Sequence, residues 1–366
     1  MNLFICGTSY QLLNAISIII STKEKADLVI IRKSIVESCN INYLQSLGYF
    51  SNIYVWTELF EKVSFEHVRN KKDIVVWIMR IAQSMVNKKK IWKSLPNRDK
   101  NYRFVFMGYV DYPSRSIYAY FKKKGSRLGL YDEGTYTYGC LDIELPFYKK
   151  LVDKLLFGSI LIDATEVVYL RLPEKIRLGK HSNIKLIKIN SICADKDRKD
   201  ILKIFNVKNE NVLLFSRSLI LFDQNLENNE IREAQFKVAE ICCAIVGKDN
   251  VLIKLHPASR KILYPKDCQI YKDKVPFEII MNSFAMSNKI LLSIFSTACF
   301  SPKQIMNQEP YVIFIYKILK KYFQIDEKYL QTIDDLREEY SDKNRIFVPN
   351  SIDELKEILH KICLCL

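Results

Sequence analysis

The stretch Val251-Leu-Ile-Lys-Leu-His256-Pro257 is an apolar run that ends in a basic residue, a histidine and a proline. Its leucine and β-branched side chains predict a buried strand, and Pro257 prevents a helix or a strand ladder from continuing through it. His256 is therefore expected where a strand stops. Ligands of open parallel sheets bind at the carboxyl ends of the strands, so His256 is a candidate site residue. The alternative is a histidine that only satisfies a loop carbonyl.

Predicted strands and helices alternate along the chain on both sides of this stretch. The predicted strands span 1–6, 26–32, 52–56, 104–107, 126–131, 212–215, 251–256, 289–293 and 311–316, and the predicted helices span 10–21, 73–95, 112–124, 229–246, 278–286, 297–306 and 351–366, with one more helix and two short strands between 146 and 188. This alternation predicts an α/β protein built from two Rossmann-like domains that face each other across a cleft.

The length of 366 residues fits roughly two domains. We expect an acceptor-side domain over 1–190, a charged linker over 191–210, a nucleotide-donor domain over 211–350 and a closing helix over 351–366. Ser351 and Glu354 predict a capping box at the start of that last helix.

Composition excludes several classes of protein. The hydrophobic content of 49% excludes disorder, and no stretch reaches the ~20 uncharged apolar residues of a membrane span. The first twenty residues lack a basic region and a cleavage site, so no signal peptide is expected and the protein is expected in the cytoplasm. The ten cysteines show neither CxxC spacing nor a nearby histidine cluster, which supports neither a disulfide framework nor a zinc site.

The net charge of +15 indicates an anionic partner, which leaves open a nucleic acid, a phosphorylated substrate and an anionic membrane. No nucleic-acid-binding motif surrounds the lysine clusters, so no nucleic acid is expected. The basic end of the helix near Lys88, or the Lys317–Phe323 segment, is a candidate for contact with the inner face of the cell membrane. An ordinary amphipathic helix covering a sheet is the alternative reading of the Lys88 region.

Two polar turns follow predicted strands in the first half of the chain. Gly7 and Thr8 form a turn with a single glycine, which lacks the GxGxxG pattern of dinucleotide sites. Asp132 and Glu133 are adjacent acids before Gly134, and on an extended backbone their side chains point in opposite directions, so only one can face a given pocket. Gly134 fits a tight turn that allows a substrate to approach closely.

These residue types suit group transfer from an activated phosphate donor. A carboxylate can take the proton of an acceptor hydroxyl, and His256 can donate a proton to the departing phosphate oxygen. Ser296 and Thr297 begin a predicted helix, where hydroxyls and free N–H groups can hold a phosphate, and Glu278 can accept two hydroxyls of a ribose. The alternatives are a plain helix cap for Ser296 and Thr297 and a first-turn helix acid for Glu278.

Asp195-Lys196-Asp197 formally matches the DxD motif of metal-dependent sugar transferases. It lies in a lysine-rich segment and not at a strand end, so no metal site is predicted.

An ordered set of short motifs resembles the bacterial sialyltransferases. Tyr131-Asp132-Glu133-Gly134, Lys254-Leu255-His256-Pro257, Pro276-Phe277-Glu278 and Ser296-Thr297 resemble their D/E-D/E-G, H-P and S-S/T motifs. The opening Cys6-Gly-Thr-Ser-Tyr-Gln-Leu-Leu-Asn-Ala is similar to the start of glycosyltransferase family 52, which includes lipooligosaccharide sialyltransferases.

The resemblance implies an inverting, metal-independent sialyltransferase of GT-B type that uses CMP-sialic acid and a galactoside acceptor of a capsule or lipooligosaccharide. Asp132 is then the preferred general base, with Glu133 as the other candidate, and His256 the general acid. Ser296 and Thr297 would hold the CMP phosphate, and Glu278 the ribose. Lys254 and the positive field would stabilise the leaving phosphate without a metal ion.

Two other functions stay open at this point. One is a GT-B enzyme that uses a nucleoside diphosphate sugar, and the other is a basic nucleic-acid-binding protein without catalysis. The sequence specifies neither the acceptor, nor the linkage, nor whether the chain forms a homodimer.

Overall fold

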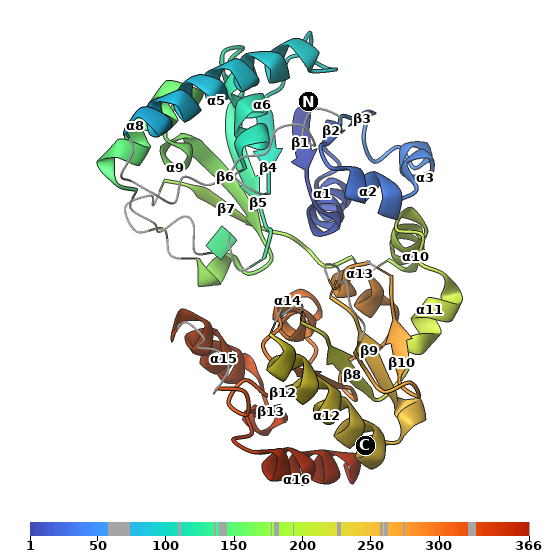
Figure 1. Ribbon diagram of the computed structural model, residues 1–366. Coiled ribbons are helices and arrows are strands. Elements are labelled where there is room, and N and C mark those ends of the chain that lie inside the picture. Colours follow the sequence, from blue (N-terminus) through green and yellow to red (C-terminus); the bar gives the residue numbers. More distant parts are fainter. Residues whose placement is uncertain are drawn as a thin grey trace. The chain divides into compact units, whose positions relative to one another are not determined.

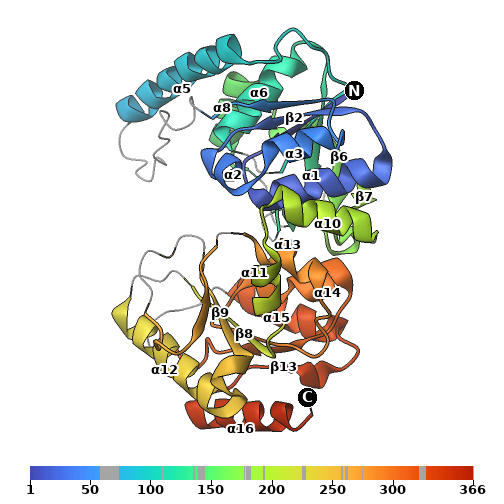
Figure 2. The ribbon, with the colours of Figure 1, turned by 90° about the vertical axis from the view of Figure 1, so that its right-hand side faces the viewer.

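The computed structural model describes residues 1–57, 74–108, 111–134, 137–138, 145–176, 178, 183–192, 194–224, 228–256, 259, 263–273, 275–320 and 327–365 (Figures 1 and 2). The chain divides into two compact units, Met1–Ile192 and Cys193–Leu366.

The first unit is built on a parallel sheet of seven strands in the order β3-β2-β1-β4-β5-β6-β7. Its strands are β1 Asn2–Cys6, β2 Ala26–Ile30, β3 Asn52–Val55, β4 Phe104–Met107, β5 Arg127–Tyr131, β6 Thr165–Leu170 and β7 Lys185–Lys188. Its helices are α1 Ser9–Thr22, α2 Lys33–Ser38, α3 Ile41–Ser46, α5 Ile74–Ser94, α6 Tyr112–Lys122, α8 Phe147–Phe157 and α9 Leu161–Ala164, with a 3₁₀ turn at Pro173–Lys175. The strand order reverses beside β1, which is the point where doubly wound sheets bind ligands.

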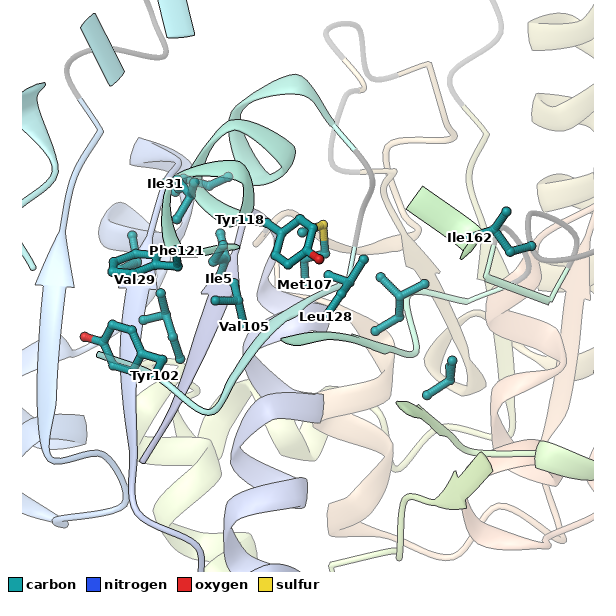
Figure 3. Packing of buried hydrophobic residues seen from close by; sticks show 14 of the residues in the cluster. Ile5, Val29, Ile31, Tyr102, Val105, Met107, Tyr118, Phe121, Leu128 and Ile162 are labelled. Carbon is teal, nitrogen blue, oxygen red and sulfur yellow. The ribbon is translucent and has the colours of Figure 1, made fainter. Parts of the chain in front are cut away.

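The central strands β1 and β4 of the first unit carry apolar side chains on both faces. Ile5 of β1 and Met107 of β4 pack in one cluster with Tyr118 and Phe121 of α6 (Figure 3). Phe4, which precedes Ile5 on β1, stacks on Phe106, which precedes Met107 on β4, at 4.9 Å between ring centroids on the other face. Both faces of these strands are therefore covered, as parallel sheets require.

The second unit repeats this plan with six parallel strands in the order β10-β9-β8-β11-β12-β13. The strands are β8 Leu219–Phe222, β9 Val251–Lys254, β10 Gln269–Tyr271, β11 Ile290–Ser293, β12 Tyr311–Phe314 and β13 Ile346–Phe347. The helices are α10 Asp195–Ile204, α11 Asn209–Leu214, α12 Asn229–Val246, α13 Phe277–Ile280, α14 Ser301–Met306, α15 Glu327–Glu339 and α16 Ile352–Cys363. Short 3₁₀ turns are η2 Lys248–Asn250, η3 Met281–Ser283, η4 Thr297–Cys299 and η5 Lys343–Arg345. The helices α12 and α16 pack together over this sheet (Figure 1).

The predicted α/β alternation is confirmed, and one predicted strand is wrong. The run 212–215 was expected to open the second sheet, but α11 covers most of it, and β8 begins only at Leu219. Glu210 lies in the first turn of α11, where an acid favours a helix. The prediction also lacked β10 and α15, which are short or strongly charged.

The charged stretch 191–210, expected as a linker, contains the helix α10. Its residues Ile201 and Ile204 are buried, so this part of the expected linker is an amphipathic helix, and the boundary between the two compact units lies at Ile192/Cys193. At the other end of the unit, Ser351 caps α16 as predicted and accepts a hydrogen bond from the Glu354 N–H at 3.2 Å. Across the described ranges, no helix is both long and apolar enough to span a bilayer.

Candidate functional site

The carboxyl edge of the first sheet begins with the turn after β1. Thr8 caps α1, its hydroxyl accepting from the Gln11 N–H at 3.1 Å, and the Gly7 N–H donates to Gln11 Oε1 at 2.6 Å. The same Gln11 side chain fills the space above Gly108, where an added Cβ would lie 2.7 Å from Gln11 Cγ. Small residues at this edge therefore let α1 begin close to the sheet.

Asp132 follows β5 and is 1% exposed. Its Oδ1 accepts from the Gly134 N–H at 2.7 Å, and its Oδ2 accepts from the Arg171 N–H at 3.0 Å and from the Tyr138 hydroxyl at 2.5 Å. Burial raises the pKa of this carboxyl, whereas the three hydrogen bonds oppose the rise. Gly134 adopts φ +93°, which suits the tight turn expected there. The Asp132 carboxyl thus connects its own loop to the backbone directly after β6 through hydrogen bonds.

Arg171, directly after β6, belongs to the same buried network. Its guanidinium donates to Asn14 Oδ1 from Nη2 at 2.7 Å and from Nε at 3.1 Å, and to Ser17 Oγ at 3.1 Å. Asn14 in turn donates to the Asp132 carbonyl at 2.9 Å. Arg171 was not predicted as a site residue from the sequence, although an arginine directly after an apolar strand was an available signal.

Glu133 has a different environment from its neighbour. Its side chain is half-buried, and among the described residues its buried Oε2 has no hydrogen-bond partner. Burial raises the pKa of Glu133 to about 7; a hydrogen bond with Gln11 opposes this, while the Asp111 carboxylate adds to it. Asp111 caps α6 at the end of β4, and Arg32, after β2, lies 3.7 Å from it with a side chain that is 57% exposed. Glu133 is therefore a carboxyl that can bind or release a proton near neutral pH.

The carboxyl edge of the second sheet contains two residues that the sequence analysis missed. Gln224 Oε1 accepts from the Phe295 N–H at 3.3 Å, and its amide donates to the Phe295 carbonyl, which joins the loops after β8 and β11. Asp223 Oδ2 accepts from the His256 N–H at 3.2 Å, and Oδ1 accepts from the Tyr264 hydroxyl at 2.6 Å. Asp223 and Gln224 directly follow the apolar run of β8. A correct prediction of that strand would therefore have indicated both residues as site candidates.

His256 lies where predicted, two residues after β9. Its side chain is exposed, but the surrounding residues still exclude part of the water and so lower the pKa of the imidazole. The Asp223 carboxylate raises this pKa, and the Lys254 ammonium lowers it further. Pro257, the next residue, lies outside the described residues.

Lys254 is the buried cation of this edge, with 5% exposure. Burial lowers its pKa to about 8, and the carboxylates of Glu278 and Asp273 oppose the shift. Its Nζ lies 5.6 Å from the ring centroid of Tyr271. Glu278, in the first turn of α13, accepts a hydrogen bond from the Ser301 hydroxyl at 2.8 Å. The structure thus groups Lys254, His256 and Glu278 around one edge.

Ser296 and Thr297 follow β11, but the long helix predicted after them is divided into the three-residue turn η4 and the helix α14. Ser296 Oγ accepts from the Ala298 N–H at 3.3 Å, which is the cap geometry that we considered as the alternative. The Thr297 side chain is exposed. A turn this short has little dipole, so any phosphate contact here depends on the hydroxyls and individual N–H groups.

The structure contains no arrangement that favours a metal at the DxD sequence. Asp195 and Asp197 are first-turn acids of α10, where they stabilise the helix start. Among the residues that the structure describes, no group of three or more potential ligands is placed to hold a metal ion.

Solved structures match nearly the whole chain. Arabidopsis thaliana UGT89C1 complexed with UDP-L-rhamnose matches with a TM-score of 0.57 and 12% identity over 99% of this chain and 89% of that one. The glycotransferase of kitacinnamycin matches at 0.51 and 8% identity over 99% and 90%, and CalG4, the calicheamicin glycosyltransferase, at 0.50 and 11% identity over 99% and 89%. The chain has the GT-B fold.

At these identities the GT-B fold is what the similarity establishes, and no activity follows from it. No family model matches the sequence, and no curated protein does. The resemblance to family 52 therefore stays a prediction. In each sheet of this GT-B chain, the polar residues described above lie at the carboxyl ends of parallel strands, including β5 and β6 in the first unit and β8, β9 and β11 in the second.

Proposed function

We propose that this GT-B chain is a glycosyltransferase that moves a sugar from a nucleotide-activated donor to a hydroxyl acceptor, with Glu133 as the general base. The observation that carries the proposal is the half-buried Glu133 carboxyl, whose pKa is raised to about 7 and whose Oε2 has no hydrogen-bond partner among the described residues. A general base works best when its pKa lies near the working pH.

Glu133 replaces Asp132 as the preferred base in this proposal. Both oxygens of Asp132 accept hydrogen bonds from the loop and from β6, and the residue is 1% exposed. An acceptor hydroxyl would have to displace these bonds to reach it. The role of Asp132 is then to hold the turn from which Glu133 projects.

The reaction follows from these roles. The acceptor O–H gives its proton to Glu133 while the acceptor oxygen bonds to the anomeric carbon. The bond from that carbon to the donor phosphate breaks, and the nucleotide leaves with the electron pair. Because acceptor and leaving group occupy opposite sides of the carbon, the configuration inverts.

The second sheet would bind the nucleotide of the donor. The pKa of Lys254 is about 8, so its side chain is mostly charged at neutral pH. His256, Ser296 and Thr297 follow strands at the same edge of the sheet. A cation and hydrogen-bond donors stabilise the phosphate that leaves. In this proposal these groups neutralise the charge of the leaving phosphate without a metal ion, and Glu278, which accepts from the Ser301 hydroxyl, binds the ribose.

CMP-sialic acid is the donor that the motifs imply, and a galactoside of a bacterial capsule or lipooligosaccharide is the implied acceptor. Sialic acid carries a carboxylate next to its anomeric carbon, so the site must tolerate a second negative charge. The net charge of +15 and the exposed Arg32 beside Asp111 fit that requirement.

A nucleoside diphosphate sugar is the second candidate donor. The observation that favours it is the similarity to UGT89C1, which was solved with UDP-L-rhamnose. This alternative keeps Glu133 as the base and changes only the nucleotide bound by the second unit.

The test is a donor screen of the purified chain with CMP-sialic acid, UDP-sugars and GDP-sugars against simple galactosides, with and without EDTA. We expect transfer from CMP-sialic acid that EDTA does not reduce. Transfer only from a diphosphate sugar would select the second candidate. Thermal shift with CMP, UDP and GDP supports the choice, because a ligand stabilises only the state that binds it. Absence of both transfer and donor hydrolysis with every donor would contradict the proposal.

A further inference from the structure

The helix α8 (Phe147–Phe157) exposes a stripe of large apolar side chains. Phe147 is 82% exposed, Leu151 55% and Leu155 54%, and Tyr148 beside them is 40% exposed. Spacing of four residues places Phe147, Leu151 and Leu155 on one side of the helix. Single exposed leucines are ordinary on protein surfaces, but a continuous apolar stripe marks a contact surface.

The opposite side of α8 is already used by the core of its own unit. Leu156 and Phe157 are buried in a cluster with Ala119 of α6, and Val152 packs against it. Asp153 is buried and forms an ion pair with Arg115 at 2.7 Å. One side of α8 thus packs against the core of the first unit, and the apolar stripe lies on the other side.

Every exposed charged side chain of α8 is a lysine. Lys149 and Lys154 are exposed and Lys150 is partly exposed, while the single acid of the helix is the buried Asp153. Two more lysines lie at its carboxyl end, where Lys88 of α5 donates to the Leu156 carbonyl and Lys122 of α6 donates to the Gly158 carbonyl at 2.8 Å. By their spacing, Lys150 and Lys154 therefore lie next to the apolar stripe, and Lys149 lies on the other side of the helix.

We propose that this α8 surface, formed by the four exposed apolar side chains together with Lys150 and Lys154, binds the interface of an anionic lipid bilayer. An apolar stripe inserts among the upper acyl chains, while lysines extend along their stems to the lipid phosphates. Each lysine near an anionic surface adds to the affinity, and the attraction weakens with salt. The occupant is a lipid surface and not a second copy of the chain, because a twofold contact would bring the lysines of both copies together.

This surface differs from the one that the sequence indicated. The sequence indicated the helix near Lys88 as a candidate. In α5, however, Ile91 is buried, and the Trp92 indole N–H donates to the Ser116 carbonyl at 2.7 Å. These large side chains therefore pack inside the first unit. The second candidate, Lys317–Phe323, lies partly outside the described residues.

The test is co-sedimentation of the whole chain with vesicles of phosphatidylcholine alone and of phosphatidylcholine mixed with phosphatidylglycerol. We expect binding to the mixed vesicles at low salt, weaker binding at high salt, and little binding to phosphatidylcholine alone. Phe147→Ser combined with Leu151→Ser should weaken binding at least about tenfold, because each buried methylene contributes. Lys150→Gln and Lys154→Gln should each weaken it about fivefold.

Matched controls come from the second unit. Leu213→Ser removes a leucine that is 67% exposed on α11, and Lys237→Gln removes an exposed lysine of α12, and neither should change vesicle binding. All substituted side chains are exposed or partly exposed, so the melting temperatures of the variants should stay close to that of the wild type. Equal binding to both vesicle types, no binding to either, or wild-type binding by the Phe147→Ser, Leu151→Ser variant would overturn the proposal. A dimer seen by light scattering that this variant dissociates would assign the surface to a second copy instead.

Discussion

The carboxyl edges of the two sheets differ in the groups whose pKa burial shifts most usefully for the proposed reaction. The first edge presents the acids Glu133 and Asp111, and the second presents Lys254 and His256. Burial raises the pKa of Glu133 to about 7 and lowers that of Lys254 to about 8. Exclusion of water disfavours the charged form whatever its sign, so one physical cause moves an acid and a base toward neutrality.

The two adjacent acids of the first edge, Asp132 and Glu133, also differ in their environments. Asp132 is buried and saturated with donors, whereas Glu133 is half-buried and one of its oxygens has no partner among the described residues. In the proposed function, Asp132 therefore stabilises the loop after β5, and Glu133 accepts the proton of the acceptor hydroxyl. The following variants separate the two assignments, from the largest expected effect to the smallest.

Glu133→Gln should lower sugar transfer by about 10² to 10⁴-fold, the usual contribution of a general base. The wild-type rate should rise through pH about 7, as Glu133 loses its proton, and the variant should lack this rise. Transfer is measured from initial rates across pH, with the melting temperature as a check on folding. Glu166→Gln, an exposed acid of β6, is the control and should leave the rate unchanged. Wild-type activity in a folded Glu133→Gln variant would remove the base from the proposal.

Lys254→Met keeps most of the side-chain volume and removes the charge, so the nucleotide should bind about tenfold to a hundredfold more weakly. Wild-type affinity should also fall above pH about 8, as Lys254 loses its proton, and affinity of the variant should not. Titration calorimetry with the nucleotide selected by the donor screen measures both.

Lys289→Met is the matched control for Lys254→Met. Lys289 is a buried lysine just before β11, at the amino end of the same sheet, where it donates to the Arg217 carbonyl at 2.8 Å. Its loss should destabilise the fold without changing nucleotide affinity. Equal loss of affinity in both lysine variants would mean that Lys254 has no specific role at the donor site.

Asp132→Asn should reduce the free energy of unfolding by about 2 kcal/mol, because an amide has one acceptor oxygen and leaves a buried N–H group unpaired. The Arg171 N–H or the Gly134 N–H would lose its partner. Urea unfolding measures the change. Glu133→Gln should show no such loss at pH 7, and if the two variants destabilised the chain equally, the division of roles between these acids would be wrong.

The same comparison shows what the sequence could and could not predict. Apolar runs ending in polar turns predicted most strands, and with them the position of His256, because burial on both faces leaves a clear pattern. The network of Arg171 with Asn14 and Asp132 joins residues from three distant segments, so no local pattern reports it. The choice between Asp132 and Glu133 depends on which one those donors reach, and that is a property of the folded loop.

The smallest expected effect is the dependence of stability on pH that Glu133 causes. Its folded pKa, about 7, lies above the ordinary value of 4.5, so between these values the native chain binds more protons than the unfolded chain. The contribution of Glu133 to stability is therefore fully present below pH about 4.5 and is lost as pH rises through 7. Because the side chain is only half-buried, the loss should be on the order of 1 kcal/mol.

Glu133→Gln has no proton to lose, so its unfolding free energy should fall less than that of the wild type across this interval. Urea unfolding at pH 5 and pH 7.5 gives the difference between the two proteins, in which the other titrating groups cancel. A wild-type stability that rises relative to the variant over the same interval would mean that Glu133 is ionised more easily in the fold than in the unfolded chain. Such a carboxylate would already be paired, and it could not serve as a base that works near neutral pH.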